Sequence, residues 1–151
     1  MTGVSHVIRH LIAVSAALRV AITEGLVERG HRLTPSVTEL VPNLPAEGLG
    51  MSALAERAGV SVQRAGQLVA QLEADGYVER VADPADGRAR RVVYTRRGRK
   101  LLTDIDALLD EATDQLVGIL GKARYERLLR DLADLDAALA DSERGLRMSG
   151  R

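Results

Sequence analysis

The chain has 151 residues with 21 basic and 21 acidic side chains, no cysteine, and an aromatic content of only 2%. The lack of cysteine excludes disulfides, thiolate metal sites and thiol redox sensing. The few aromatic residues leave Leu, Val, Ile and Ala to fill the core. The length suits one domain, or a small domain with added helices.

The charges are unevenly distributed although they sum to zero. Residues 51–100 hold ten cations against six acids, whereas residues 101–143 hold four cations against eleven acids. Seven of the cations lie between positions 88 and 100, where no acid occurs. This asymmetry indicates that one part of the molecule faces a polyanion while another part repels it, which favours a single bound orientation.

The first predicted helix runs from about Val4 to Gly30, because apolar residues recur at helical spacing and glycine suits a helix end. His6 and His10 have the spacing of two metal ligands on one helix face, but no third ligand lies nearby. We therefore interpret them as a solvated or interface pair and expect no metal site. No run of 18 uncharged apolar residues occurs in the chain, so we expect a cytoplasmic protein without a membrane segment.

The next predicted element is a short helix that begins after Thr34, with Pro35 at its first position, and that Pro42 must end. A turn-rich connection follows it over residues 43–48. His31, beside Gly30, is expected to be an ordinary loop residue.

Two further helices are predicted over residues 50–58 and 61–73, with Gly59 between them. The small residues Ala55, Gly59 and Ala65 suit the close crossing of a helix-turn-helix, and glycine suits the positive φ of its turn. If the apolar face of the second helix turns inward, its leading outer surface suits base edges in the major groove. The alternative is an αα-hairpin with a solvated polar face. The outer residues are Ser61, Val62, Gln63, Arg64 and Gln67.

A β-hairpin is predicted from a strand over residues 77–81 to a strand over residues 91–94, with its turn at residues 83–87. Near the tip, Asp86 and Arg88 are close enough in sequence for the carboxylate to hold the guanidinium in a fixed pose. A constrained arginine suits the negative potential of a narrow minor groove, and Arg90 and Arg91 lie beside it. The alternative is a surface hairpin with an ion pair of little energetic weight.

The carboxy-terminal part is predicted to be helical. Thr95 can cap a long helix from Arg96, which Gly118 and Gly121 weaken, and a last helix runs from about Tyr125; the tail after Ser142 is expected to fray. The amino- and carboxy-terminal apolar stripes exceed what a winged helix of about 65 residues can cover. We therefore predict a homodimer interface at Leu11, Leu18, Ile22, Leu116, Leu128, Leu132 and Leu135.

Residues 60–61, 72–80, 83–88 and 94–98 together resemble the winged-helix signature of the MarR family, the multiple-antibiotic-resistance type of bacterial transcriptional regulator. The resemblance implies that the first and last two helices interlock in a homodimer and that the helix after the glycine turn enters the major groove. It also implies that Arg88 enters the minor groove with Asp86 positioning it. A small-molecule effector would bind between the dimer helices and the DNA-binding lobe.

The sequence thus predicts an α+β fold, mostly α, with a winged helix-turn-helix over residues 33–97. A dimerisation helix over residues 1–32, dimerisation helices over residues 98–145 and a tail over residues 146–151 would flank it. The predicted function is a homodimeric repressor of a pseudo-palindromic operator on double-stranded DNA, released by a small molecule. No cofactor or enzymatic activity is expected, because no nucleophile–base set or phosphate-binding glycine loop occurs. The alternative is a helical dimeric interaction adaptor whose basic hairpin meets an acidic partner without specific DNA binding.

Overall fold

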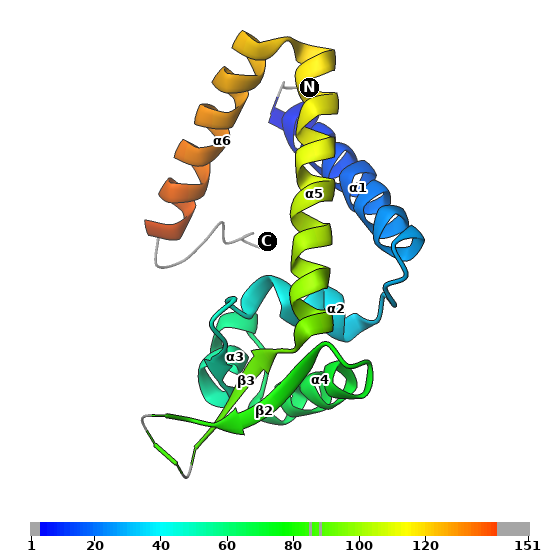
Figure 1. The fold of residues 1–151 in the computed structure, drawn as a ribbon. Coiled ribbons are helices and arrows are strands. Elements are labelled where there is room, and N and C mark those ends of the chain that lie inside the picture. Colours follow the sequence, from blue (N-terminus) through cyan, green and yellow to red (C-terminus); the bar gives the residue numbers. More distant parts are fainter. Residues whose placement is uncertain (1–3, 85, 88, 142–151) are drawn as a thin grey trace. The chain divides into compact units, whose positions relative to one another are not determined.

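The computed structural model describes residues 4–84, 86–87 and 89–141 (Figure 1). It has two compact units, residues 1–109 and residues 110–151. The predicted tail and Arg88 lie outside the described residues. The elements, in chain order, are α1 (Val4–Glu28), α2 (Pro35–Leu40), the 3-10 turn η1 (Val41–Asn43), β1 (Leu49–Gly50), α3 (Met51–Ala58), α4 (Val62–Ala74), β2 (Val78–Ala82), β3 (Arg90–Tyr94), α5 (Arg96–Leu120) and α6 (Lys122–Asp141).

The three strands form a small antiparallel sheet in the order β1-β3-β2. Together with the helices this sheet gives an α+β fold, mostly α, so the predicted fold class is confirmed. In the β2–β3 hairpin, Val78 pairs with Tyr94 and Ala82 pairs with Arg90, so the hairpin forms where the alternating pattern predicted it. The short strand β1, which pairs Leu49 with Val92, was not predicted. Two residues are too few to produce an alternating pattern.

The α3–α4 pair has the geometry of a helix-turn-helix. Gly59 ends α3 in the left-handed conformation at φ 66°, and its N–H donates to carbonyls of the last turn of α3. Glycine adopts this conformation without the clash that a Cβ would cause. Ser61 then caps α4, as its Oγ accepts the Arg64 N–H at 3.1 Å. The predicted positive φ of Gly59 is therefore confirmed, and Ser61 is the N-cap of α4.

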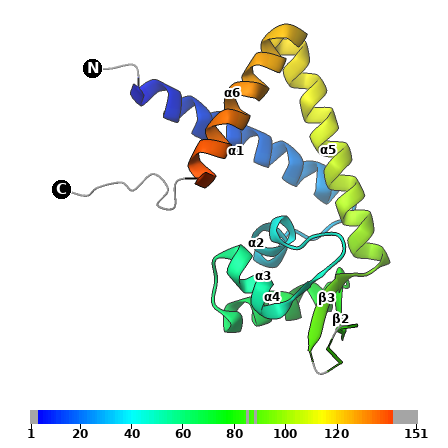
Figure 2. The ribbon, with the colours of Figure 1, turned by 90° about the vertical axis from the view of Figure 1, so that its left-hand side faces the viewer.

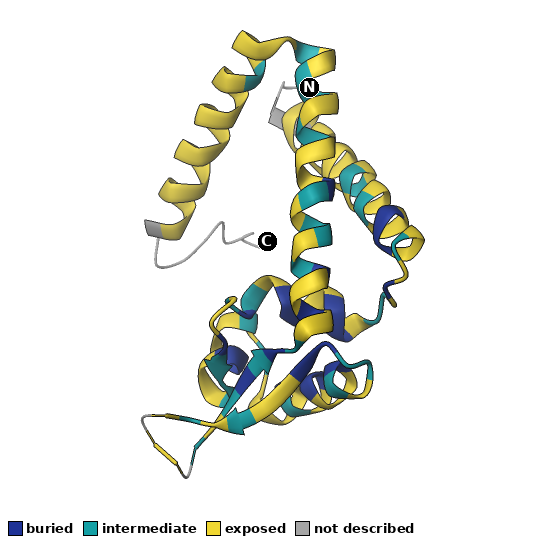
Figure 3. Ribbon diagram, in the orientation of Figure 1, coloured by how far each residue is buried: buried dark blue, intermediate teal, exposed yellow. Residues whose placement is uncertain are grey.

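The core of the first unit lies where α2, α3 and α4 meet the sheet and the first turns of α5 (Figures 2 and 3). No buried side-chain nitrogen or oxygen among the described residues lacks a hydrogen-bond partner. This part of the chain is therefore both apolar inside and saturated in its polar contacts. Its buried apolar residues are Leu26, Val37, Leu40, Val41, Leu44, Leu54, Leu68, Val69, Leu72, Tyr77, Val78, Val92, Tyr94, Leu101 and Leu108.

The start of α5 packs against the sheet with almost no space between them. Thr95 caps the helix, since its Oγ1 accepts the Gly98 N–H at 3.1 Å and donates to the Gly76 carbonyl at 2.6 Å. A Cβ placed on Gly98 would lie 1.9 Å from the Tyr77 carbonyl oxygen and 2.8 Å from the Tyr94 ring. Only glycine allows this approach, which sets where α5 leaves the winged lobe, the part of the chain formed by α2, α3, α4 and the sheet.

Helix α1 is largely uncovered along most of its length. Only its last turns are packed, as Leu26 is buried and Ile22 lies against the core cluster. By length and composition alone, residues His6–Glu28 could cross a membrane, with a mean hydropathy of 1.5 and 11% of the most apolar stretch buried. Core helices of soluble proteins, which are mostly buried, and signal sequences have the same length and apolar composition. The exposed large apolar residues of α1 are Val7, Ile8, Leu11, Ile12, Val14, Val20 and Val27.

The second unit consists of the end of α5 and the whole of α6. Gly121, at φ 77°, separates the two helices, and the Tyr125 N–H donates to its carbonyl at 3.1 Å. Gly118 does not interrupt α5, which continues to Leu120. Helix α6 exposes leucines at helical spacing, so this unit also has an apolar surface without a covering layer (Figure 3). These residues are Leu128, Leu129, Leu132, Leu135 and Leu139.

Candidate nucleic-acid interface

The leading outer face of α4 presents every residue that the sequence assigned to the major groove. Ala65, Leu68, Val69 and Leu72 are buried, so the predicted inward face of the helix is confirmed. The residues of the opposite face are exposed, and their amide, hydroxyl and guanidinium groups are available as donors to base edges. The exposed residues are Ser61, Val62, Gln63, Arg64 and Gln67.

Arg64 on this face is paired with a residue of another helix. Its Nη2 donates to Oε1 of Glu39 at 3.1 Å and to Oε2 at 3.3 Å. The two side chains are 46% and 40% exposed, respectively. Glu39 lies near the end of α2, and it was not singled out in the sequence because 25 residues separate it from its partner.

A hollow of about 210 Å³ lies between α2 and α4, and Arg64 and Gln67 form part of its wall. The predicted base-contacting residues therefore do not all lie on a smooth helix surface. Two of them border a depression that α2 closes on its other side. The lining residues are Pro35, Ser36, Arg64, Gln67, Leu68 and Gln71.

The loop between β2 and β3 is closed by backbone hydrogen bonds. The Asp83 N–H donates to the Ala89 carbonyl at 3.0 Å, and the Ala89 N–H donates to the Asp86 carbonyl at 2.9 Å. Asp86 is exposed, as expected for the tip of a wing. The predicted arrangement of its carboxylate with Arg88 lies outside the described residues.

The two arginines that begin β3 have different environments. Arg90 is exposed. Arg91 is half-buried, and its Nη2 donates to the Gly48 carbonyl at 2.9 Å and to the Glu47 carbonyl at 3.4 Å. Arg91 therefore ties β3 to the loop before β1, while Arg90 presents its charge to solvent.

Most of the cations further along are also engaged within the lobe. The guanidinium carbon of Arg97 lies 5.0 Å from the centre of the Tyr77 ring, a cation–π distance. Arg99 donates from Nη1 to the Tyr94 carbonyl at 2.8 Å, and Lys100 pairs with Asp104. The cations of residues 88–100 therefore have a largely structural role. Among the described members of this run, Arg90 and Arg96 have exposed side chains and make none of these intramolecular contacts.

Arg80 is a further residue that sequence reasoning missed. Its Nη1 lies 3.0 Å from Oε2 of Glu73, and its Nη2 donates to the Gly66 carbonyl at 3.3 Å. Arg80 belongs to β2 and both partners belong to α4, so it fixes the base of the wing against the helix that carries the candidate base contacts. The opposite charges on either side of the turn at residues 75–77 were the available signal.

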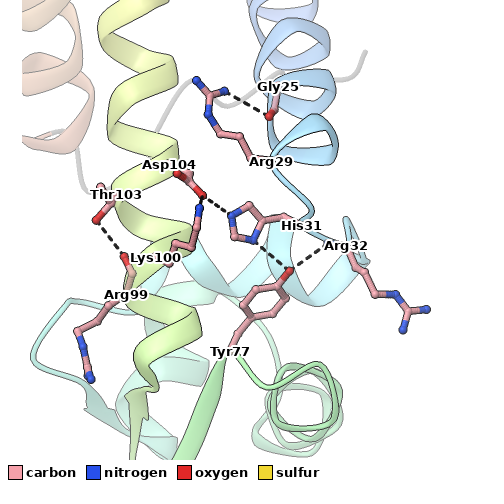
Figure 4. Close-up of polar contacts among 9 residues, drawn as sticks. All are labelled: Gly25, Arg29, His31, Arg32, Tyr77, Arg99, Lys100, Thr103 and Asp104. Atoms are coloured by element: carbon pink, nitrogen blue, oxygen red, sulfur yellow. Dashed lines mark hydrogen bonds and ion pairs between the residues drawn. The ribbon is translucent and has the colours of Figure 1, made fainter.

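A buried polar cluster links the loop after α1 to α5 and to Tyr77, the residue before β2 (Figure 4). His31 is in a loop, as expected, but its side chain is buried. Its Nε2 lies 2.6 Å from Oδ2 of Asp104, and its Nδ1 lies 3.3 Å from the Tyr77 hydroxyl, which accepts the Arg32 N–H at 3.0 Å. Hydrogen bonds from Lys100 and His31 hold the pKa of Asp104 below its usual range. His31 therefore has a structural role, because it connects the loop after α1 to Asp104 and Tyr77.

The two histidines of α1, His6 and His10, are exposed. Within residues 4–84, 86–87 and 89–141, no group of three or more His, Asp and Glu side chains is placed to hold a metal ion.

Comparison with known proteins places this arrangement in a family. The model of the MarR family matches residues 44–89, which run from the loop before β1 to the wing. A transcriptional regulator of the MarR family from Rhodococcus sp. RHA1 is 25% identical, with 93% of this chain and 97% of that chain covered and a TM-score of 0.65. Residues 44–89 thus match the MarR family, and a MarR-family regulator is similar to this chain over nearly its whole length.

Two other proteins extend the comparison. The HTH-type transcriptional regulator BilQ of Clostridioides difficile (strain CD3) is 28% identical over 64 residues, and the match spans only 43% of BilQ and 42% of this chain. CouR from Rhodococcus jostii RHA1, solved with bound p-coumaroyl-CoA, is 28% identical, with 86% of this chain and 88% of that chain covered and a TM-score of 0.62. The transcriptional repressor CouR has also been solved with a 23-mer DNA duplex, at a TM-score of 0.64 and 22% identity, with 84% of this chain and 89% of that chain covered.

Proposed function

We propose that this MarR-family chain is a homodimeric transcriptional regulator that binds a pseudo-palindromic operator on double-stranded DNA, most simply as a repressor. The observation that carries the proposal is the exposed amino-terminal face of α4, which follows a left-handed glycine turn and bears Gln63, Arg64 and Gln67. Arginine pairs with guanine and glutamine with adenine in the major groove. The proposal is supported by CouR, a transcriptional repressor of similar fold that has been solved bound to a 23-mer DNA duplex.

The wing is proposed as the second contact with DNA. Arg90 is exposed at the start of β3, next to the loop that carries Asp86. We propose that Arg88 enters the minor groove, that Asp86 positions it, and that Arg90 contacts phosphate. We propose that Arg91 contributes less to DNA binding than its charge suggests, because its guanidinium donates to backbone carbonyls.

Dimerisation is proposed because α1 and α6 each expose a row of large apolar residues. Apolar surface without a covering layer in a soluble protein favours contact with another chain. A twofold dimer places two copies of α4 on two half-sites, which accounts for a palindromic operator. In such a dimer the exposed residues of α1 belong to a subunit interface in a cytoplasmic protein, and α1 does not cross a membrane.

Release by a small molecule is the proposed mode of control. CouR supports it as a relative that has been solved with p-coumaroyl-CoA. Linkage requires that an effector bind the DNA-competent and DNA-incompetent conformations with different affinities. An enzymatic activity forms no part of the proposal.

The proposal is tested by selecting sequences from a pool of random duplexes of about 30 base pairs, long enough for two half-sites about one turn apart. We expect enrichment of an inverted repeat. The protein should bind the enriched duplex at least about 10³-fold more tightly than a shuffled duplex at physiological salt. Binding of similar strength to every duplex, lost steeply as salt rises, would instead support the interaction adaptor with a basic hairpin.

A further inference from the structure

The contact between Glu39 and Arg64 joins the end of α2 to the first turn of α4. Both carboxylate oxygens of Glu39 face Nη2 of Arg64, at 3.1 and 3.3 Å. The Arg64 N–H is meanwhile bonded to the Ser61 Oγ. Arg64 is thus constrained twice, through its backbone by the helix cap and through its guanidinium by a neighbouring helix.

This ion pair has little weight in the stability of the lobe. Both side chains remain 40% exposed or more, and exposed pairs of this kind contribute little to folding. Neither residue belongs to the apolar core cluster. The effect of the pair therefore lies in where it holds the guanidinium.

A carboxylate beside a DNA-binding helix opposes binding, because phosphates repel it. The same carboxylate restricts an arginine that could otherwise swing toward any nearby phosphate. Among the described residues, the guanidinium contacts use Nη2, which leaves Nη1 and Nε to donate to acceptors on a base edge. Glu39 thus lowers affinity for DNA in general and favours one pose of Arg64.

We propose that Glu39 is a positioning residue that increases sequence specificity by holding Arg64 for a base edge and away from the phosphate backbone. This inference rests on the proposed function, since it requires that α4 enter the major groove. Glu39 itself makes no base contact and acts through Arg64. Its removal should therefore raise binding to unrelated DNA while it weakens discrimination.

The test compares the wild type with Glu39→Ala, Arg64→Ala and the double variant on the enriched and shuffled duplexes. Glu56→Ala is the matched control, because Glu56 is also an exposed helical glutamate of the same lobe and has no ion pair with Arg64. Glu39→Ala should tighten binding to the shuffled duplex and lower the ratio of the two affinities about tenfold, the size of one base contact. Glu56→Ala should leave the ratio unchanged.

The double variant separates positioning from a structural effect. In the Arg64→Ala background, the Glu39 substitution should no longer change the ratio, and thermal unfolding of every variant should resemble that of the wild type. An unchanged ratio in Glu39→Ala, or a fall in the ratio that persists without Arg64, would overturn the inference and leave the proposed function standing. A wild type that prefers no duplex would overturn both.

Discussion

The winged lobe and the helices α1 and α6 differ in how much of their apolar surface is buried. The lobe buries most of its leucines and valines and two tyrosines in one cluster, and its buried polar side chains all have partners among the described residues. Most of α1 and the leucine row of α6 leave large apolar residues in solvent. The lobe therefore covers most of its own apolar residues, whereas α1 and α6 leave a row of theirs uncovered.

The same contrast applies to charge. Arginines of the lobe that look available in the sequence are engaged at carbonyls or over a ring, as Arg91, Arg97 and Arg99 are. A count of cations therefore overstates the charge that a lobe of this kind can offer to phosphate. The position of each guanidinium matters more than the number of guanidinium groups.

Gly98→Ala is the strongest way to break the lobe. The new Cβ would meet the Tyr77 carbonyl oxygen at 1.9 Å, and backbone cannot move aside as a side chain can. We expect the free energy of unfolding to fall by about 3 kcal/mol or more, measured by denaturant titration. Gly118→Ala is the control on the same helix, because no atom lies within 4 Å of its Cβ position, and it should be neutral or stabilising. Equal stability of the two variants would contradict the tight packing of α5 on the sheet.

Leu132→Asp is the corresponding change on the uncovered surface. Leu132 is 39% exposed in the single chain, so a monomer would tolerate a charge there. In a dimer the charge is buried at the interface, and operator affinity should fall about 100-fold as one half-site is lost. Sedimentation and DNA binding measure the two effects. Ala137→Asp, on the other side of α6, should change neither quantity, and a dimeric Leu132→Asp protein would refute the assigned interface.

Tyr94→Phe removes a buried polar contact from the lobe. The Tyr94 hydroxyl lies 3.0 Å from the Leu44 carbonyl oxygen and 3.3 Å from that of Val41. Its loss removes the donor to the Leu44 carbonyl, whereas the Val41 carbonyl still accepts the Leu44 N–H. We expect a destabilisation of about 1–2 kcal/mol at neutral pH, measured by chemical unfolding. Tyr125→Phe, in the second unit, is the control and should have a smaller effect.

Tyr94 also gives the lobe a stability limit at alkaline pH. Burial raises the pKa of the Tyr94 hydroxyl to about 12, from its ordinary value of 10.0. Between these two values the unfolded chain releases the proton and the folded chain retains it, so rising pH favours unfolding. The wild type should lose stability progressively above pH 10, and Tyr94→Phe should lose less over the same range. Parallel pH curves for the two proteins would contradict the assignment.

Arg90→Ala and Arg91→Ala compare an arginine exposed to solvent with one whose guanidinium donates to backbone carbonyls. The exposed Arg90 should contribute to phosphate binding, so its loss should weaken every duplex several-fold and lower the salt slope by about 1. Loss of Arg91 should instead lower thermal stability, because the carbonyls of Glu47 and Gly48 lose their donor. A reversal of the two outcomes would show that Arg91 contributes to DNA binding and not to the stability of the fold.

Gly66→Ala should have the smallest effect. Gly66 lies inside α4, and no atom lies within 4 Å of a Cβ placed there. Alanine is the better helix former by roughly 1 kcal/mol, so the variant should be more stable by up to that amount. Thermal unfolding tests this expectation. A destabilised protein would mean that α4 needs the flexibility of glycine at this point.

Elements with local signals were predictable from the sequence. Gly59 marked the turn between α3 and α4, and the alternating residues of the hairpin indicated both of its strands. Pro42 marked where the α-helix α2 gives way to the 3-10 turn η1. These signals depend on neighbouring residues only, since glycine, proline and capping side chains act on their own backbone. The inward and outward faces of α4 followed from helical periodicity in the same way.

The partners of charged residues were not predictable, because they come from distant parts of the chain. The Glu39–Arg64 pair spans 25 residues and the His31–Asp104 pair spans 73. No periodic pattern links such positions, and only the packing of the lobe brings them together. The candidate residues of the interface could therefore be named from the sequence, but not the contacts that orient them.

The three tyrosines of a chain without tryptophan have an optical consequence. Tyr77 and Tyr94 are buried in the lobe, and Tyr125 lies on α6 in the second unit. Intrinsic tyrosine emission is therefore not obscured by energy transfer to an indole ring. A Tyr125→Phe protein would emit from the lobe alone, and a protein with phenylalanine at positions 77 and 94 would emit from α6 alone. The two signals would allow the unfolding of each unit to be followed separately without an added dye.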